Sequence, residues 1–258
     1  MAQLVDIIVP VYNEEKALPQ SIQQLTQFLE GNVSQQWRVI IADNASTDTT
    51  PQVSQRLSEQ YPGVSYLRIP QKGRGRALRT AWLASEADLV CYMDVDLSTN
   101  LRHLPQLIEA LESGYDVAVG SRLSRESQTT RGWRREIISR CYNLLIRSLF
   151  FTSFPDAQCG FKAMTTTAAR AILPHIENNN WFFDTELLLI AAKRGYRIKS
   201  VPVQWDDDPT STVHVVNTAT EDVKGLLRLR FGGIPRVAGP DHQPAATDLD
   251  RDRNQINR

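Results

Sequence analysis

Two carboxylates stand one residue apart in the segment Cys91–Ser98, which reads CYMDVDLS. The run Asp88–Met93 is short, apolar and rich in β-forming residues, which is typical of a strand buried on both faces. In open α/β sheets, ligands bind in the crevice beyond the C-terminal ends of the strands. We therefore expect Asp94 and Asp96 to face such a crevice.

A pair of carboxylates at a strand end suits a hard divalent cation. Mg²⁺ and Mn²⁺ prefer oxygen ligands and are commonly held by one or two carboxylates, with substrate phosphates completing the shell. Asp94 and Asp96 are thus the predicted metal ligands, and a diphosphate is the predicted substrate group. The pair alone is a weak signal, because Asp96 or Ser98 would also serve as the N-cap of a helix starting near Leu101.

Polar residues also follow the predicted strands Val5–Val11 and Trp37–Ala42. Glu14, which follows the first, would accept a hydrogen bond from a ribose or base donor, and Asp43, which follows the second, from a base N–H. The alternative for the second segment is a turn whose side chains cap the next helix. We favour ligand contact for Asp43 and a turn role for Ser46.

A glycine-rich segment, Gln71–Ala77 or QKGRGRA, separates a third strand from a helix. Its glycines permit tight backbone geometry, and Lys72 and Arg74 would face a phosphate at the helix N-terminus. It is neither a Walker A sequence nor a complete Gly-x-Gly-x-x-Gly, which argues against an ordinary dinucleotide-binding domain. A solvated basic turn is the alternative.

These motifs lie between predicted strands and helices that alternate regularly along the chain. The predicted strands are residues 5–11, 37–42, 64–69, 89–93 and 116–119. Helical patterns of apolar residues separate them, which predicts an α/β fold with a mostly parallel sheet and helices on both faces.

The second half of the chain changes in character. Residues 121–150 contain seven arginines and two acids, and their apolar residues form a broad helical stripe. A second amphipathic helix is predicted over Thr220–Phe231. Core packing is one interpretation of both stripes, and contact with an anionic membrane surface or a phosphate is the other.

Composition limits the class of protein. With 258 residues and 41% hydrophobic content, the chain can form a sizeable core, and 29 basic against 29 acidic residues give no indication of a nucleic-acid partner. Three scattered cysteines suit a reducing cytosol. Neither a signal peptide nor an apolar membrane span is predicted.

We expect one domain over residues 1–236 and a disordered tail over 237–258.

Eight segments, in order over residues 5–231, carry a resemblance to a known family. They read IIVPVYNEE, ADNASTDTT, KGRGRAL, YMDVDLS, VGSR, DAQCGFKAM, WFFDTELLL and VPVQW. The chain resembles the inverting family 2 glycosyltransferases of GT-A fold. Within them it is most similar to the enzymes that glycosylate dolichyl or polyprenyl phosphate with glucose or mannose. DAQCGFK and FDTELL are the motifs specific to that branch.

The resemblance implies a role for each matched residue. The residues expected to hold the nucleoside are Pro10, Tyr12, Glu14 and Asp43. The residues expected where donor sugar and acceptor meet are Asp156, Gln158, Lys162, Asp184 and Glu186. The cations expected near phosphates are Lys72, Arg122, Arg134 and Arg135. Asp94 and Asp96 would hold the metal on the diphosphate. For Asp184, a helix N-cap is an equally good interpretation.

The implied reaction moves a hexose from a nucleotide sugar, UDP-glucose rather than GDP-mannose, to a polyprenyl phosphate, with Mg²⁺ or Mn²⁺ as cofactor. Arg122 would stabilise the leaving phosphate, and Asp156 would orient the acceptor. A lipid phosphate, with a second pKa of about 6, needs no general base. The protein would work peripherally on the cytoplasmic face of a membrane. A soluble or polysaccharide acceptor, or a non-catalytic nucleotide-sugar binding protein, are the alternatives.

Two positions depart from the family pattern. The family's DDGS is replaced by Asp43–Ser46, which keeps the first acid and lacks the glycine. Thr212 stands where related synthases carry a lysine, so a phosphate-binding cation is missing or is supplied by an arginine.

Overall fold

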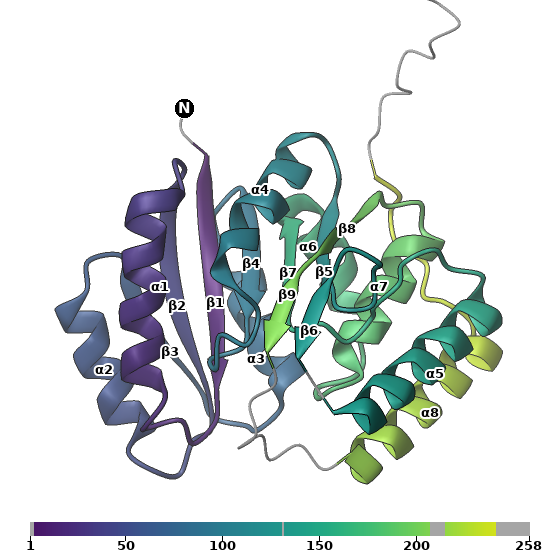
Figure 1. Cartoon of the computed structure of the whole chain (residues 1–258), viewed down its shortest axis with the longest axis horizontal. Helices are drawn as coiled ribbons and strands as arrows, with labels where there is room; N and C mark the ends of the chain where they lie inside the picture. Colours follow the sequence, from purple (N-terminus) through teal and green to yellow (C-terminus); the bar gives the residue numbers. More distant parts are fainter. Residues whose placement is uncertain (1–2, 131, 207–214, 241–258) are drawn as a thin grey trace, which may run out of the picture.

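The structure, a computed structural model, describes residues 3–130, 132–206 and 215–240. Seven strands form one sheet in the order β3-β2-β1-β4-β7-β5-β8 (Figure 1). They are β1 (Leu4–Val11), β2 (Gln36–Asn44), β3 (Val64–Ile69), β4 (Leu89–Met93), β5 (Val117–Ser121), β7 (Phe161–Thr165) and β8 (Ile198–Pro202). The short strands β6 (Gln128–Thr130) and β9 (Gln204–Asp206) pair with each other.

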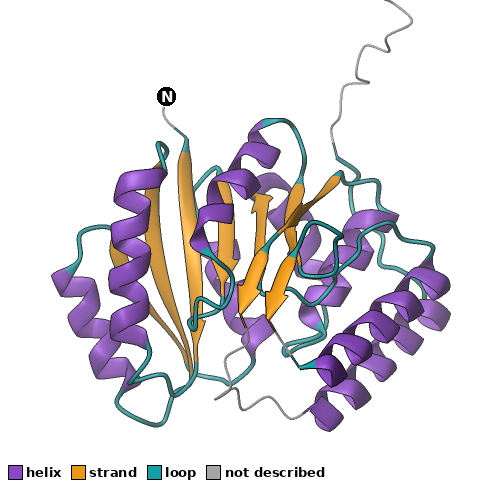
Figure 2. Cartoon of the chain, in the orientation of Figure 1, coloured by secondary structure: helices purple, strands orange, loops and turns teal. Residues whose placement is uncertain are grey.

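Helices flank the sheet on both sides, which confirms the predicted α/β fold (Figure 2). They are α1 (Leu18–Asn32), α2 (Thr50–Gln60), α3 (Arg74–Ala84), α4 (Leu104–Glu112), α5 (Trp133–Phe150), α6 (Thr166–Ile172), α7 (Phe183–Lys193) and α8 (Val215–Gly232). All five residues of β4 are buried, as expected of a strand covered on both faces. Four apolar residues of α1 recur at helical spacing and are fully buried: Leu18, Ile22, Leu25 and Leu29.

Strand β7 runs antiparallel to both of its neighbours, β4 and β5, whereas the other pairs in the sheet are parallel. The direction of this strand was not predicted. Because it runs against β4 and β5, its first residue lies at the edge where those strands end. Residues 156–160, which precede β7, are thereby brought to the C-terminal edge of the sheet.

Helix α3 begins at Arg74, inside the glycine-rich segment Gln71–Ala77 that was expected to precede the helix. The backbone of Gly73 has φ 151°, a conformation that side-chain-bearing residues rarely adopt, so the chain turns sharply from loop into helix there. This early start places Arg74 in the first turn of the helix.

Residues 237–240, which the sequence analysis assigned to a disordered tail, belong to the described part of the chain. Val237 packs against the core, and the hydroxyl of Tyr196 donates a hydrogen bond to the carbonyl of Ala238 at 2.7 Å. These contacts explain why the first residues of the predicted tail are ordered. Residues 241–258 lie outside the described part of the chain.

Helices α5 and α8 lie side by side at one end of the molecule, at the lower right of Figure 1. One side of each contributes to the core, through Ile146 and Leu226 for example. The other side is exposed and apolar, with Trp133 68%, Leu144 63% and Phe231 81% exposed. Core packing therefore accounts for one side of each stripe, and contact with a membrane surface or a phosphate stays a prediction for the other. No helix in the described ranges is long and apolar enough to cross a membrane.

Candidate active site

Strand register brings several of the predicted site residues to one edge of the sheet. Val11 of β1 pairs with Asp43 of β2, so the residues after β1 lie beside Asp43. Met93 of β4 pairs with Phe161 of β7, which sets Asp94 opposite Gly160. The N–H of Asp94 donates to the carbonyl of Gly160 at 3.2 Å. The motifs YMDVDLS and DAQCGFK thus meet at this edge.

The two predicted metal ligands border a small cavity between the end of β4 and Trp205. The Asp94 side chain is 42% exposed, and Asp96 is exposed. Within the described residues, no group of three or more acidic, histidine or cysteine side chains is placed to hold a metal. Two accessible carboxylates therefore fit a cation that takes its remaining ligands from a diphosphate and water, as Mg²⁺ and Mn²⁺ do.

Gly160 is required by the close approach of Asp94. A Cβ atom on Gly160 would lie 1.7 Å from Oδ2 of Asp94, far inside van der Waals contact. Only glycine therefore allows the Asp94 carboxylate its observed position. The glycine in DAQCGFK is an indicator of the site that the sequence analysis did not use.

Replacing Gly160 by alanine is expected to weaken Mn²⁺ affinity about tenfold. The added Cβ would displace the carboxylate of Asp94, a predicted metal ligand, and the loss of a group that orients a metal ligand has an effect of about this size. Titration of Mn²⁺ in the presence of UDP, followed by electron paramagnetic resonance, measures this. Gly31→Ala is the matched control, since a Cβ there meets no atom within 4 Å. Unchanged Mn²⁺ affinity in Gly160→Ala would remove Asp94 from the ligand set.

Arg74 links the exposed carboxylate of Asp94 to a buried group of charges. Its Nη2 lies 2.6 Å from Oδ1 of Asp94, and its Nη1 lies 2.7 Å from Oδ2 of Asp184. Oδ1 of Asp184 lies 2.8 Å from Nζ of Lys162 and also accepts a hydrogen bond from Tyr92. Arg74 is thus a structural part of the site, and the alternative of a solvated basic turn is wrong for it.

The cations around Asp184 keep it ionised. Burial by itself raises the pKa of this carboxyl, but Lys162 and Arg74 outweigh burial and lower the pKa below its usual value. Helix α7 begins after Phe182 without a side-chain cap, so the N-cap interpretation of Asp184 is wrong. Lys162 is itself buried and also donates to the carbonyl of Cys159 at 2.6 Å.

Arg122 and Asp156 form a buried bidentate pair. Nε of Arg122 lies 2.8 Å and Nη2 3.0 Å from the two oxygens of Asp156, and the N–H of Arg122 donates to the same carboxylate. Burial would raise the pKa of Asp156, but the Arg122 guanidinium outweighs it and lowers the pKa. A carboxylate with a lowered pKa is a poor proton acceptor, so this geometry suits positioning rather than general-base catalysis.

Asp43, at the predicted nucleoside end, is fully buried. One oxygen accepts from the N–H of Ser46 at 2.9 Å, which is the turn contact that was weighed as the alternative. The other accepts from the hydroxyl of Tyr66 at 2.9 Å and from Arg68 at 2.8 Å. Tyr66 and Arg68, on β3, are neighbours of Asp43 that sequence analysis missed.

The other predicted nucleoside contacts lie nearby. Pro10 is near the end of β1, and Lys72 sits over the ring of Tyr12, 3.6 Å from its centroid. The N–H of Glu14 donates to the hydroxyl of Thr50 at 2.8 Å.

The remaining predicted residues lie toward α5 and α8. Gln158 donates from its side chain to Asp222 of α8 at 3.0 Å. Glu186 is buried, accepts hydrogen bonds from backbone N–H groups of residues 177 and 178, and pairs with Arg228 of α8 at 2.7 Å. Arg135 is exposed on α5, while the side chain of Arg134 and all of Thr212 lie outside the described residues.

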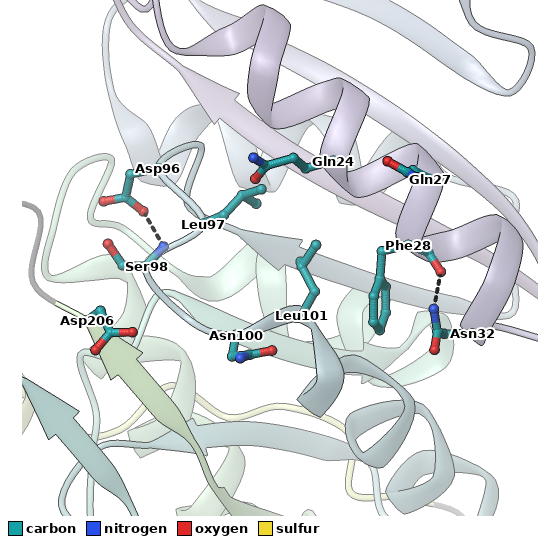
Figure 3. A pocket seen from close by; sticks show the side chains of 10 residues that line it. All are labelled: Gln24, Gln27, Phe28, Asn32, Asp96, Leu97, Ser98, Asn100, Leu101 and Asp206. Carbon is teal, nitrogen blue, oxygen red and sulfur yellow. Dashed lines mark hydrogen bonds between the residues drawn. The ribbon is translucent and has the colours of Figure 1, made fainter.

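A groove of about 760 Å³ extends from Asp96 along α1 (Figure 3). Amide side chains line much of it, namely Gln24, Gln27, Asn32 and Asn100, and Phe28, Leu97 and Leu101 supply apolar surface. The side chain of Asn100, rather than Asp96 or Ser98, caps the short helix that follows, through a bond from the N–H of Arg102. The N-cap interpretation of Asp96 is therefore wrong.

The chain is similar to known proteins in sequence and in fold. Residues 6–173 match the model of glycosyl transferase family 2. The chain is 34% identical over 225 residues to glycosyltransferase AglD of Haloferax volcanii, which covers 86% of this chain and 35% of AglD. It is 29% identical over 240 residues to dolichyl-phosphate beta-glucosyltransferase ALG5C of Trichomonas vaginalis, with 87% of this chain and 71% of that protein covered. The chain thus spans about a third of AglD.

Among solved structures, glucosyl-3-phosphoglycerate synthase from Mycobacterium tuberculosis, in complex with Mn²⁺, UDP-glucose and phosphoglyceric acid, aligns with a TM-score of 0.68. The alignment covers 91% of this chain and 81% of that one, at 18% identity. A likeness at this level of identity establishes a common fold.

Proposed function

Since the chain belongs to glycosyl transferase family 2, we propose that it is a metal-dependent inverting transferase that moves a hexose from a nucleotide sugar to a polyprenyl phosphate. UDP-glucose is the favoured donor. The observation that carries the proposal is the meeting of Asp94 with Gly160, which joins the diphosphate end of the site to the segment Asp156–Lys162. The dolichyl-phosphate glucosyltransferase relatives support the choice of acceptor and sugar.

The chemistry depends on where charge develops. Mg²⁺ or Mn²⁺ held by Asp94 and Asp96 would stabilise negative charge on the leaving diphosphate. Asp156 holds the side chain of Arg122 at the same edge of the sheet. The positive charge of Arg122 is therefore already in place and needs no rearrangement during the reaction. An ionised lipid phosphate attacks from the opposite side of the anomeric carbon and inverts it. No residue has to remove a proton, which agrees with the lowered pKa of Asp156.

A lipid acceptor requires the protein to approach a membrane, and the exposed side of α5 and α8 suits that contact. Trp133, Ile137 and Leu144 recur at helical spacing on α5, as do Val223, Leu227 and Phe231 on α8, and all are exposed. Arg140 and Arg230 flank these apolar residues. Apolar residues bordered by cations favour peripheral binding to an anionic leaflet, such as the cytoplasmic face.

The double variant Leu144→Glu, Phe231→Glu is expected to lower binding to anionic liposomes by tenfold or more, because each apolar side chain contributes about 1.5–3 kcal/mol when buried. Flotation of protein with vesicles measures the bound fraction. Leu83→Glu on α3, where the leucine is 39% exposed, is the matched control and should bind as the unmodified protein does. Equal binding of all three proteins would exclude these helices as the membrane surface.

Transfer to a saccharide acceptor is the second candidate, and the groove beside Asp96 favours it. Amide groups next to an aromatic ring suit sugar hydroxyls and sugar faces, and the groove is continuous with the proposed metal ligand. The groove lies along α1, whereas the apolar surface lies on α5 and α8.

One assay separates the candidates. Purified protein receives UDP-glucose or GDP-mannose, Mg²⁺ or Mn²⁺, and either a polyprenyl phosphate or a mixture of oligosaccharides. Radiolabel that moves into the organic phase, and is lost with EDTA, supports the lipid acceptor and identifies the donor. Label in the oligosaccharides alone would replace that acceptor. No transfer to either acceptor, together with tight UDP binding, would indicate a protein that only binds nucleotide sugars.

A further inference from the structure

Asp222 is a buried acid of α8 that has no assigned role. Its residue is 3% exposed, and Oδ2 accepts a hydrogen bond from Nε2 of Gln158 at 3.0 Å. Oδ1 is buried and makes no hydrogen bond of good geometry within the described residues, although the hydroxyl of Tyr142, which lies 3.1 Å from that of Thr185, is close to the carboxyl. A buried carboxylate oxygen that lacks a well-formed hydrogen bond is unfavourable, so an acid at this position calls for a reason.

Gln158 is held between two carboxylates. Its N–H donates to Oδ1 of Asp156 at 3.1 Å, and its side-chain amide donates to Asp222. Asp156 in turn holds Arg122. The backbone of Gln158 is therefore set by the Arg122–Asp156 pair, and the direction of its side chain is set by Asp222.

Burial and three neighbouring groups decide the charge of the Asp222 carboxyl. Burial raises its pKa most, and the neighbouring Glu221 on the same helix raises it further, to about 7. Asp184 on α7 acts in the same direction, and the hydroxyl of Tyr142 on α5 opposes it. Asp222 therefore changes charge near neutral pH. Its ionised form makes a charge-assisted hydrogen bond to Gln158, which is stronger than the bond to the neutral acid.

We propose that Asp222 is a positioning residue that orients the side-chain amide of Gln158 where donor sugar and lipid phosphate meet. This inference rests on the proposed function, because it assigns Gln158 to that junction. Asp222 also adjoins Val223 of the exposed apolar surface, so it connects that surface to the junction.

The role carries a cost in stability. A raised pKa means that the folded protein prefers the protonated acid, so the contribution of Asp222 to stability is complete only below the unfolded pKa of 3.8 and is lost as the pH rises from there through about 7. The form that orients Gln158 is therefore the less stable one. If the role of Asp222 were only structural, its ionised form would not be both the less stable and the more active one.

The test uses Asp222→Asn, which keeps the shape and an acceptor oxygen but cannot ionise. At pH 8 we expect kcat/KM for the polyprenyl phosphate to fall about tenfold while UDP affinity stays unchanged. At pH 6, where Asp222 is protonated in the unmodified protein, the two proteins should differ little. Taking the ratio of the two proteins at each pH cancels the ionisation of the acceptor itself.

Thermal unfolding provides the second measurement. Asp222→Asn should melt at a higher temperature than the unmodified protein at pH 8, and the difference should shrink as the pH is lowered toward 4, where the acid is protonated in the unfolded chain as well. Glu109→Gln, which neutralises an exposed acid on α4, is the control and should change neither profile. An equal loss of activity at both pH values, together with lower stability, would show a structural role and overturn the proposal. An unchanged kcat/KM at pH 8 would also overturn it.

The contact can be tested even if the unmodified protein transfers no sugar to lipid, an outcome that would refute the proposed function itself. The side-chain amide signal of Gln158 in nuclear magnetic resonance spectra can be assigned by its loss in Gln158→Met. That signal should shift with a midpoint near pH 7 in the unmodified protein and stay constant in Asp222→Asn. A signal that is independent of pH in both proteins would refute the positioning role.

Discussion

Asp96→Asn is expected to lower the rate of lipid-linked sugar formation about 10²- to 10³-fold, the range seen when one group that stabilises developing charge is removed. Asparagine keeps the shape of aspartate but loses the negative charge that attracts a divalent cation. Asp96 is exposed at the end of β4, so the substitution should leave the fold intact. Initial rates with saturating Mn²⁺, and Mn²⁺ affinity measured separately, distinguish lost metal from lost chemistry.

Asp88→Asn is the matched control, because Asp88 immediately precedes the other end of β4. It accepts a hydrogen bond from the N–H of Leu4 at 2.9 Å and lies on the edge away from the site. Its transfer rate should stay within about twofold of the unmodified protein, since most surface substitutions change stability by no more than about 0.5 kcal/mol. Equal activity of Asp96→Asn and Asp88→Asn would refute the assignment of Asp96 as a metal ligand.

Arg122→Gln is expected to lower the free energy of unfolding by about 3–5 kcal/mol, because it leaves the fully buried Asp156 carboxylate without its counter-ion. At about 2–4 °C per kcal/mol for a chain of this size, the melting temperature should fall by roughly 10 °C. Transfer should be lost as well if Arg122 stabilises the leaving phosphate as proposed, since the substitution removes that charge. Urea unfolding and calorimetry measure the stability change.

The pH dependence of this variant identifies the cause. In the unmodified protein the pKa of Asp156 is lowered on folding, so the pair contributes stability above the unfolded pKa, and the contribution is lost as the pH falls through the folded pKa. Without Arg122, burial alone raises that pKa, so the deficit of the variant should shrink as the pH is lowered from 7.5 to 4.5.

Arg140→Gln breaks an exposed i,i+4 pair with Glu136 and should cost only about 0.3–0.5 kcal/mol. It is the control for removing an arginine as such. A deficit in Arg122→Gln that is small, or that does not depend on pH, would contradict the account of the buried pair.

The arrangement of strands and helices was predictable because hydrophobic periodicity is a local property. Leu18, Ile22 and Leu25 reveal the buried side of α1 by their spacing alone. The short apolar run that became β4 revealed the strand, and its end placed Asp94 at a sheet edge. The same reasoning placed Asp43 at the end of β2.

Direction and partnership of distant segments were not predictable in this way. Nothing in the residues of β7 states that it runs antiparallel between β4 and β5, because strand direction depends on how the chain returns to the sheet. Arg74 is a similar case. A basic residue after glycine has the same local pattern whether it faces solvent or joins Asp94 to Asp184, which is 110 positions away.

The sequence by itself therefore determined the α/β class, the strand ends that carry the carboxylates, and the amphipathic stripes of α5 and α8, since each depends on residues within one or two elements. The tertiary structure decided which charges pair and which elements share the site. The antiparallel β7 brought Gly160 against Asp94, and the packing of α8 placed Asp222 on Gln158. These contacts join residues far apart in the chain, so their energies depend on burial and on partners that no local pattern specifies.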